Sequence, residues 1–277
     1  YSVFGYREYP SLIKGGVASY QIDLSNEAIE SSTTTIDILV CLNHHPLRLC
    51  LPSMKSGGIV IHSTAEWKFP KEHLELIAKR QLKIIELPIE TIITELKTKP
   101  ILSNTLLTGF VWSIFGLDPK LLETVLCAKF QKKKDLLEIN RTCLERGALL
   151  NAGEKKVNIN LPKPSSVFED QLLITGSKAM GLGAVHAGVR LYAGYPMTPS
   201  SPLLSFIAEL QNATGMIIKQ AEDEITAAQI VSGAMHAGTR ALTATSGGGF
   251  DLMSETLSLN GIIENPTVFV LAQRPGP

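Results

Sequence analysis

The chain has 277 residues, 44% of them hydrophobic, which is enough for two ordinary domains with apolar cores. Its 26 basic and 26 acidic residues cancel, which argues against a nucleic-acid-binding protein, because such proteins usually carry a basic excess. The sequence contains no run of about 18 apolar residues, so no membrane span is expected.

Residues 1–165 predict a first domain of the α/β class. Residues 3–6 resemble the end of a strand, and residues 19–24 alternate between polar and apolar as an edge strand does. Apolar runs typical of central parallel strands follow at 36–42, 59–62 and 82–87, with a helical segment at 70–80. Strands joined by helical segments indicate a parallel sheet.

Helical patterns dominate residues 88–150. The longest apolar block, residues 105–117, is too short to span a membrane and predicts a buried core helix. Asp118, followed by Pro119, is expected to cap the next helix, and Asp135 to cap the last one. Residues 151–170 mix Gly, Lys, Asn, Pro and Ser as linkers do, and we place the domain boundary near residue 165.

Residues 166–277 predict a second α/β domain in which strand, turn and helix recur. The expected strands are 172–176 (or a turn), 191–195, 216–220, 241–246 and 267–272, and the expected helices are 178–190, 202–212, 223–237 and 250–259. This alternation is typical of a parallel sheet, and ligands of such sheets bind outside the carboxyl ends of the strands. We therefore expect the turns that follow these strands to form one site.

The glycine-rich turn after strand 241–246 allows two interpretations. At Ser246, Gly247 and Gly248, with Gly249 beyond them, backbone N–H groups can approach a phosphate or a carbonyl group. A plain connection between a strand and a helix would use the same residues. The pattern alone leaves both open.

Three consecutive acids, Glu222, Asp223 and Glu224, stand at the start of helix 223–237. Acids are common there because they complement the helix dipole. Glu224, however, shares its helical face with small apolar residues at i+3, i+4 and i+7, namely Ala227, Ala228 and Val231. We therefore predict that Glu224 points inward or toward a partner, whereas Glu222 and Asp223 point elsewhere.

Arg274 follows the last predicted strand and precedes a Pro-Gly-Pro sequence. A guanidinium group at this edge of a sheet suits bidentate binding of a carboxylate or a phosphate. The ordinary alternative is a surface arginine in a loop.

The four cysteines, Cys41, Cys50, Cys127 and Cys143, are far apart and form no CxxC motif. Iron–sulfur clusters and zinc sites need clustered thiolates, so we expect neither on this chain. Free thiols in a large α/β chain point to the cytoplasm.

Four motifs in this order resemble the α subunit of the 2-oxoacid:ferredoxin oxidoreductases, the family that includes the 2-oxoglutarate and pyruvate ferredoxin oxidoreductases. They are residues 194–201 (GYPMTPSS), 222–225 (EDEI), 245–250 (TSGGGF) and 273–277 (QRPGP). Residues 8–16, with Tyr20, resemble the γ domain that some members carry ahead of the α domain. The resemblance implies a Rossmann-like γ domain over 1–165 and a pyrimidine-type thiamine diphosphate domain over 166–277, the latter continuing beyond Pro277.

The resemblance also implies a reaction: oxidative decarboxylation of a 2-oxoacid, acyl transfer to coenzyme A, and electron transfer to ferredoxin. The α domain of this family contributes a glutamate to the aminopyrimidine ring of thiamine diphosphate. The diphosphate, its Mg²⁺ and the [4Fe–4S] cluster belong to the partner β subunit. Carried onto this sequence, Glu224 is the catalytic ring partner, and Thr198 and Arg274 face the substrate. The residues implied to line the cofactor, besides Glu224, are Pro196, Thr198, Ser246, Gly247 and Gly248.

The sequence thus predicts an oxidoreductase subunit that is active only with its β subunit, in a hetero-oligomer or a dimer of αβ units. The alternative is a non-catalytic assembly or phosphate-binding α/β module that keeps the fold. 2-Oxoglutarate is the preferred substrate by resemblance, while pyruvate and branched-chain 2-oxoacids remain open. Neither a nucleic acid nor a membrane is an expected partner.

Overall fold

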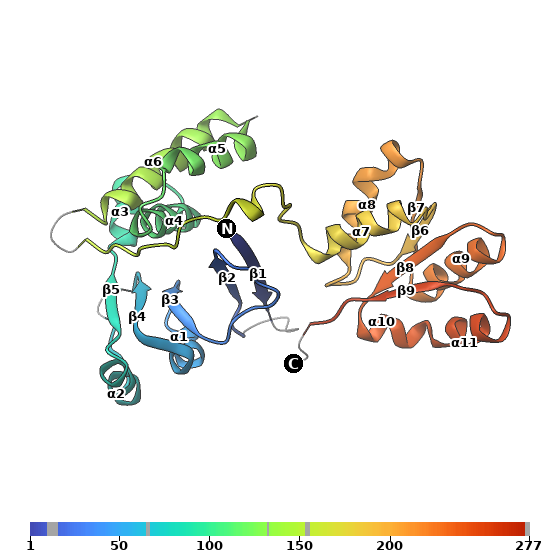
Figure 1. Ribbon diagram of the computed structural model, residues 1–277, viewed down its shortest axis with the longest axis horizontal. Coiled ribbons are helices and arrows are strands. Elements are labelled where there is room, and N and C mark those ends of the chain that lie inside the picture. Colours follow the sequence, from blue (N-terminus) through green and yellow to red (C-terminus); the bar gives the residue numbers. More distant parts are fainter. Residues whose placement is uncertain (10–15, 65–66, 132, 153–155, 275–277) are drawn as a thin grey trace. The chain divides into compact units, whose positions relative to one another are not determined.

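The computed structural model describes residues 1–9, 16–64, 67–131, 133–152 and 156–274 (Figure 1). The chain divides into two compact units. The first comprises Tyr1–Tyr6 and Gln21–Glu169, and the second comprises Arg7–Tyr20 and Asp170–Pro277, as far as these are described. Each unit contains a parallel sheet with helices, so the predicted α/β class is confirmed.

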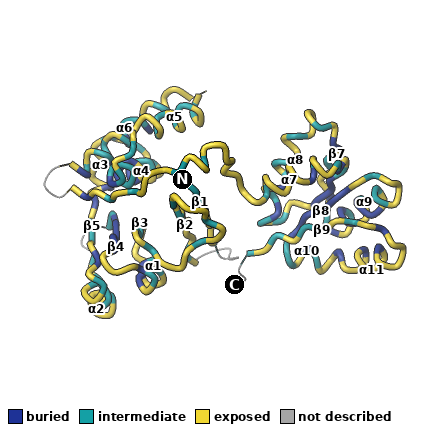
Figure 2. Tube along the Cα trace, viewed as in Figure 1, coloured by how far each residue is buried: buried dark blue, intermediate teal, exposed yellow. Residues whose placement is uncertain are grey.

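The parallel sheet of the first unit has the order β3-β4-β5. Its strands are β3 (Ile36–Cys41), β4 (Met54–His62) and β5 (Lys83–Glu86). The apolar runs predicted β3 and β5 to within a residue, whereas β4 begins five residues before the predicted run 59–62. Alternate residues of β4 enter different cores: Ile59 and Ile61 pack in one cluster, and Val60 packs in another. Both faces of β4 are therefore covered over residues 58–62, as expected of a central parallel strand (Figure 2), whereas residues 55–57 are exposed.

Helices and short turns connect these strands and continue after them. Before β5 the chain forms α1 (His45–Cys50), η1 (Leu51–Ser53) and α2 (Lys71–Lys79). After β5 it forms α3 (Ile89–Glu95), η2 (Pro100–Leu102), α4 (Ser103–Ile114), α5 (Pro119–Phe130), α6 (Lys134–Leu149) and η3 (Ser166–Phe168). The predicted core helix is α4, which buries Leu106, Phe110 and Ile114.

Two glycines let α4 and α6 pack backbone against backbone. A Cβ atom added to Gly109 on α4 would lie 2.9 Å from the carbonyl carbon of Leu144, and one added to Gly147 on α6 would lie 2.9 Å from that of Leu106. Real Cβ atoms do not approach so closely, so any larger residue here forces the helices apart.

One of the two predicted caps is confirmed and the other is wrong. Asp118 Oδ1 accepts a hydrogen bond from the backbone N–H of Lys120 at 2.9 Å, as expected of a cap. Asp135 does not cap α6, because the helix begins one residue earlier and Asp135 lies inside its first turn. There its charge still complements the helix dipole. Lys133 takes the cap position, with no side-chain cap hydrogen bond recorded in the described chain.

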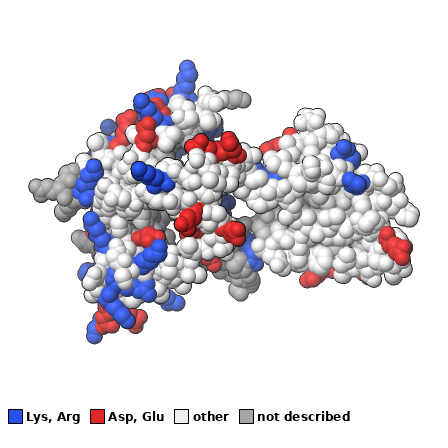
Figure 3. Space-filling view, viewed as in Figure 1, with Lys and Arg blue, Asp and Glu red and all other residues white. Residues whose placement is uncertain are grey.

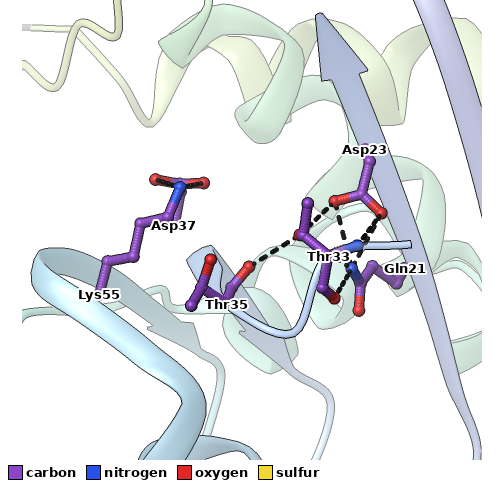
Figure 4. Close-up of polar contacts among 6 residues, drawn as sticks. All are labelled: Gln21, Asp23, Thr33, Thr35, Asp37 and Lys55. Atoms are coloured by element: carbon purple, nitrogen blue, oxygen red, sulfur yellow. Dashed lines mark hydrogen bonds and ion pairs between the residues drawn. The ribbon is translucent and has the colours of Figure 1, made fainter. Parts of the chain in front are cut away.

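Strands β1 (Ser2–Glu8) and β2 (Ser19–Ser25) pair in a separate sheet. A polar cluster links β2 to the segment that leads into β3 (Figure 4). Asp23 accepts hydrogen bonds from Gln21 Nε2 at 2.9 Å and from Thr33 Oγ1 at 2.7 Å. The nearby Lys55–Asp37 ion pair, 2.8 Å long, is exposed and adds little stability.

The sheet of the second unit has the order β7-β6-β8-β9 and is parallel throughout. Its strands are β6 (Leu191–Gly194), β7 (Ile217–Gln220), β8 (Ala241–Thr245) and β9 (Val268–Leu271). Its helices are α7 (Gly176–His186), α8 (Ser201–Thr214), α9 (Glu224–His236), α10 (Gly247–Leu252) and α11 (Ser254–Ile262). Every residue of β8 is buried. Helix α8 packs Leu203 and Ile207 into the core beside Tyr192.

Two element predictions for this unit need correction. Residues 172–175, expected as a strand or turn, form neither in this described segment, and Thr175 instead caps α7. The single helix expected at 250–259 is two helices, α10 and α11, which meet at the buried Met253. In the ranges that the structure describes, no helix is both long and apolar enough to cross a membrane.

Candidate active site

The turns singled out in the sequence lie at one edge of the β7-β6-β8-β9 sheet. Gly194 pairs with Gln220, and Thr245 pairs with Leu271, so these parallel strands end side by side. Beyond the strand ends, Ala221 N donates to Gly194 O at 3.0 Å, and Ala272 N donates to Thr245 O at 2.9 Å. The prediction that the turns share the carboxyl edge is confirmed.

Glu224 is the first residue of α9, and its side chain is turned into the protein. Only 4% of its surface is exposed, and its neighbours on the same helical face, Ala227, Ala228 and Val231, are fully buried. Its Oε1 atom is buried, and no described residue gives it a hydrogen bond. A carboxylate oxygen in this situation is poorly solvated unless a ligand donates to it.

The two preceding acids behave differently from Glu224. Asp223 caps α9, since its Oδ1 accepts a hydrogen bond from the backbone N–H of Thr226 at 2.7 Å. That hydrogen bond lowers the pKa of the Asp223 carboxyl. Glu222 is exposed. Of the three acids, Glu224 is thus the buried one, which is the orientation that helical spacing predicted.

The glycine turn brings α10 against the Glu224 side chain. A Cβ atom built on Gly249 would lie 2.7 Å from Glu224 Oε1 and 2.8 Å from Glu224 Cγ, and it would also overlap Thr245 Oγ1. For Gly247 and Gly248, by contrast, no described atom lies within 4 Å of such a Cβ. Ser246 and Gly247 are half-buried and Gly248 is exposed, so these backbones are open to a ligand at the sheet edge.

Thr198 and Pro196 lie in the exposed turn between β6 and α8. Met197 O closes this turn by accepting hydrogen bonds from Ser200 N at 2.8 Å and from Ser200 Oγ at 2.6 Å. Arg274 follows β9 and is half-buried, with its guanidinium carbon 5.3 Å from the centre of the Tyr9 ring in the same compact unit. Among the described residues, no hydrogen bond or ion pair joins Thr198 or Arg274 to Glu224.

Sequence reasoning gave no role at this site to three residues of its motifs: Gly249, Thr245 and Tyr9. A Cβ atom on Gly249 would meet both Glu224 Oε1 and Thr245 Oγ1, and the guanidinium group of Arg274 lies over the Tyr9 ring. Thr243 and Thr245 alternate in the otherwise apolar strand β8, and both hydroxyls are buried with no partner among the described residues. Threonines at this spacing in a buried strand were the available signal.

The unpartnered acceptor at Glu224 fits the aminopyrimidine ring that the sequence motifs imply. A ring N–H needs an acceptor that nothing else occupies, and Glu224 Oε1 is such an atom in the described chain. Gly249 keeps the space beside that oxygen free of a side chain. No group of three or more His, Cys, Asp or Glu side chains suited to a metal ion occurs within the described ranges.

Two family models match the chain. Residues 1–150 match the model "Pyruvate ferredoxin/flavodoxin oxidoreductase", and residues 182–277 match "Pyruvate flavodoxin/ferredoxin oxidoreductase, thiamine diP-bdg". The second match contains the whole β7-β6-β8-β9 sheet and the edge described above.

Curated relatives and a solved structure give the same result. The chain is 28% identical to the 2-oxoacid:ferredoxin oxidoreductase subunit alpha of a Sulfolobus species, in an alignment covering 100% of this chain and 50% of the relative. It is 46% identical over 105 residues to the 2-oxoglutarate synthase subunit KorA of Archaeoglobus fulgidus, which covers 38% of this chain and 30% of the relative. A 2-oxoglutarate:ferredoxin oxidoreductase from Magnetococcus marinus, solved with 2-oxoglutarate, coenzyme A and succinyl-CoA bound, matches with a TM-score of 0.82 and 30% identity, over 99% of this chain and 47% of that one. The chain thus spans about half the length of these relatives, or less.

Proposed function

The chain belongs to the pyruvate ferredoxin/flavodoxin oxidoreductase family, and on that premise we propose that it supplies the pyrimidine-side half of a thiamine diphosphate site in a 2-oxoacid:ferredoxin oxidoreductase. The proposed reaction converts a 2-oxoacid and coenzyme A into an acyl-CoA and carbon dioxide, with electrons passing to ferredoxin. Our proposed substrate is 2-oxoglutarate, because several similar relatives and the matching structure carry that name.

One observation carries the proposal: Glu224 is buried at the carboxyl edge of the sheet, with Oε1 lacking a partner among the described residues. Thiamine diphosphate supplies a nucleophilic carbon that lets a 2-oxoacid lose carbon dioxide. The buried Glu224 carboxylate would hold the cofactor's aminopyrimidine ring by accepting a hydrogen bond from its protonated nitrogen, and would thereby support the acid–base chemistry that the bound cofactor supplies. Assistance of this kind is worth roughly 10² to 10⁴ in rate.

The remaining site residues take the roles that the family resemblance gives them. Thr198 and Arg274 bind the substrate carboxylate and keto oxygen, and a guanidinium group suits a carboxylate through paired hydrogen bonds. Pro196, Thr198, Ser246, Gly247 and Gly248 line the cofactor. Their positions in the turns of one sheet edge are compatible with these roles.

The other half of the site belongs to a β subunit in this proposal, together with Mg²⁺, the diphosphate contacts and a [4Fe–4S] cluster. Apolar side chains are exposed on the segments that carry the site: Tyr195 after β6, Ile225 on α9 and Leu252 on α10. Exposed apolar groups beside a ligand edge suit burial against another subunit. We place the assembled enzyme in the cytoplasm, as a hetero-oligomer or a dimer of αβ units.

We assign residues 1–165 to a γ-type domain and residues 166–277 to the pyrimidine-binding domain. The two family matches, over 1–150 and 182–277, support a boundary between them. The described segment from 169 to 175 holds no helix or strand, which suits a connection between domains.

The test is turnover of the assembled αβ enzyme with a panel of 2-oxoacids, comparing wild type with Glu224→Gln and Glu222→Gln. Glu224→Gln should lose most turnover with assembly intact, by roughly 10² to 10⁴. Glu222→Gln should keep most of it, since that side chain is exposed. Thiamine diphosphate binding without turnover on any 2-oxoacid would favour the non-catalytic module, and a dead Glu222 variant beside an active Glu224 variant would reverse the assignment.

A further inference from the structure

Gly249 and Thr245 surround the carboxylate of Glu224, from a strand end and a helix start that are remote from α9 in sequence. The Cβ position of Gly249 lies 2.7 Å from Glu224 Oε1 and overlaps Thr245 Oγ1, so both oxygens adjoin the same point. Both oxygens are buried, and neither has a hydrogen-bond partner in the described part of the chain. Gly249 itself is buried.

This arrangement differs from ordinary close packing of glycine. A Cβ atom on Gly181 would meet Phe206 Cδ1 at 2.7 Å, which is a ring edge that can turn aside. A Cβ atom on Gly249 would instead meet the carboxylate itself and the Cγ atom behind it. Glu224 and its neighbours on the same helical face, Ala227, Ala228 and Val231, are all buried, and a packed interior leaves a displaced side chain little room.

We propose that Gly249 and Thr245 are positioning residues for Glu224, an inference that rests on the proposed function. Because Gly249 has no side chain, the Glu224 carboxylate can occupy the space beside it. A side chain at this position would push Oε1 away from the ring nitrogen whose hydrogen bond it accepts. Thr245 offers the hydroxyl nearest to that space and can donate to the carboxylate once the site is assembled. Together they fix the direction in which Glu224 presents its free oxygen.

The experiment uses the assembled αβ enzyme with three readouts: the dissociation constant of thiamine diphosphate, the circular dichroism of the bound aminopyrimidine ring, which distinguishes its tautomers, and the melting temperature. Gly249→Ala should assemble, bind the cofactor at least ~10-fold more weakly and lose the imino-tautomer signal, because a displaced hydrogen bond to a charged group costs more than one factor of ten. Gly233→Ala is the matched control. Gly233 is exposed on α9, the helix of Glu224, and no described atom lies within 4 Å of its added Cβ. It should match wild type in the first two readouts.

Thr245 provides a pair of variants that tests the same idea without added bulk. Thr245→Ser keeps the hydroxyl and should keep the imino-tautomer signal, while Thr245→Val has nearly the same shape without the hydroxyl and should lose it. A purely structural role would move the melting temperature of both variants and leave the signal in place. If Gly249→Ala fails to fold, the two Thr245 variants still test whether this pair of residues positions Glu224.

Two results would overturn the inference: Gly249→Ala with the affinity and spectrum of wild type, or Thr245→Val and Thr245→Ser with equal, unaltered spectra. Its failure is distinguishable from failure of the proposed function. If Glu224→Gln loses the signal and Gly249→Ala and Thr245→Val keep it, only the positioning role is wrong. If Glu224→Gln itself keeps the signal, the proposed function is wrong.

Discussion

At the scale of single residues, the three consecutive acids at the start of α9 differ in their surroundings. Asp223 caps α9 by accepting a hydrogen bond from the backbone N–H of Thr226, while Glu224, one residue later, is buried in the protein interior. One residue turns the side chain by about 100° around the helix. Glu224, the buried carboxylate, is also the one whose Oε1 atom has no hydrogen-bond partner in the described chain. Such burial is unfavourable unless a ligand donates a hydrogen bond to that oxygen.

Arg274 gives the first residue-scale prediction. Arg274→Ala should raise the KM for the 2-oxoacid by ~10-fold or more, because a charge-assisted bond to the substrate carboxylate is lost, and it should leave the KM for coenzyme A unchanged. Initial rates with each substrate varied in turn measure both constants. Arg190→Ala is the control, since Arg190 precedes β6 at the opposite edge of the sheet. Equal increases for both substrates would remove Arg274 from the substrate site.

His62 gives a pH prediction. It is buried at the end of β4, its ring 4.8 Å from that of Trp67, with Nδ1 unpartnered among the described residues. Burial lowers the pKa of His62 below its ordinary value of 6.5, although the nearby Glu86 acts in the opposite direction. As the pH falls, His62 therefore becomes protonated at a higher pH in the unfolded chain than in the folded chain. The contribution of neutral His62 to the free energy of unfolding is present above pH 6.5 and is lost as the pH falls below it.

Urea unfolding at pH 7.5 and pH 5.5, followed by Trp fluorescence, measures this effect. The wild type should lose stability between the two values, and His62→Gln should lose less because it removes the titrating group. A His62→Gln variant with the same pH dependence as wild type would show that other groups cause it.

At the scale of elements, the sequence predicted the strands better than the helix ends. Continuous apolar runs marked β3, β6 and β8 to within a residue or so, because burial on both faces leaves no alternative pattern. The division between α10 and α11 at Met253 was not predictable, since it depends on what Met253 packs against. Asp135 failed as a cap because nothing local distinguishes the first helical residue from the one before it.

The contact between α4 and α6 gives the element-scale prediction. Gly147→Ala should destabilise the first unit by about 1–3 kcal/mol, because its Cβ would meet the backbone of Leu106, which cannot rotate away. Gly183→Ala on α7 is the control, with no described atom within 4 Å of its Cβ, and it should stabilise its helix by about 1 kcal/mol. Melting temperatures of the two variants measure both effects. Equal shifts would mean that α4 and α6 are not in this close contact.

At the scale of the whole molecule, the two units differ in surface character. On the face shown in Figure 3, charged side chains gather over the first unit, and few lie on the second. Interface cores are poor in charged residues, so this face of the second unit has the composition of a surface that a partner can cover.

The sequence predicted those parts of the candidate site that lie in motifs directly after a strand. Glu224, the Ser246–Gly248 turn and Arg274 each follow a recognisable strand, and parallel topology alone brings them to one edge. The roles of Gly249, Thr245 and Tyr9 could not be assigned in the same way, because those roles depend on distances across the fold. Spacing predicts which residues share an edge, and only the structure tells which of them touch.

The central claim is that Glu224 of this chain promotes removal of the proton from C2 of thiamine diphosphate. The most direct measurement is the rate at which that proton exchanges with deuterium in the assembled αβ enzyme, since it needs no 2-oxoacid, coenzyme A or ferredoxin. Glu224→Gln should slow this exchange by roughly 10² to 10⁴ with the cofactor still bound, and Glu222→Gln should leave it unchanged. An exchange rate in the Glu224→Gln enzyme equal to that of wild type would show that Glu224 does not have this role.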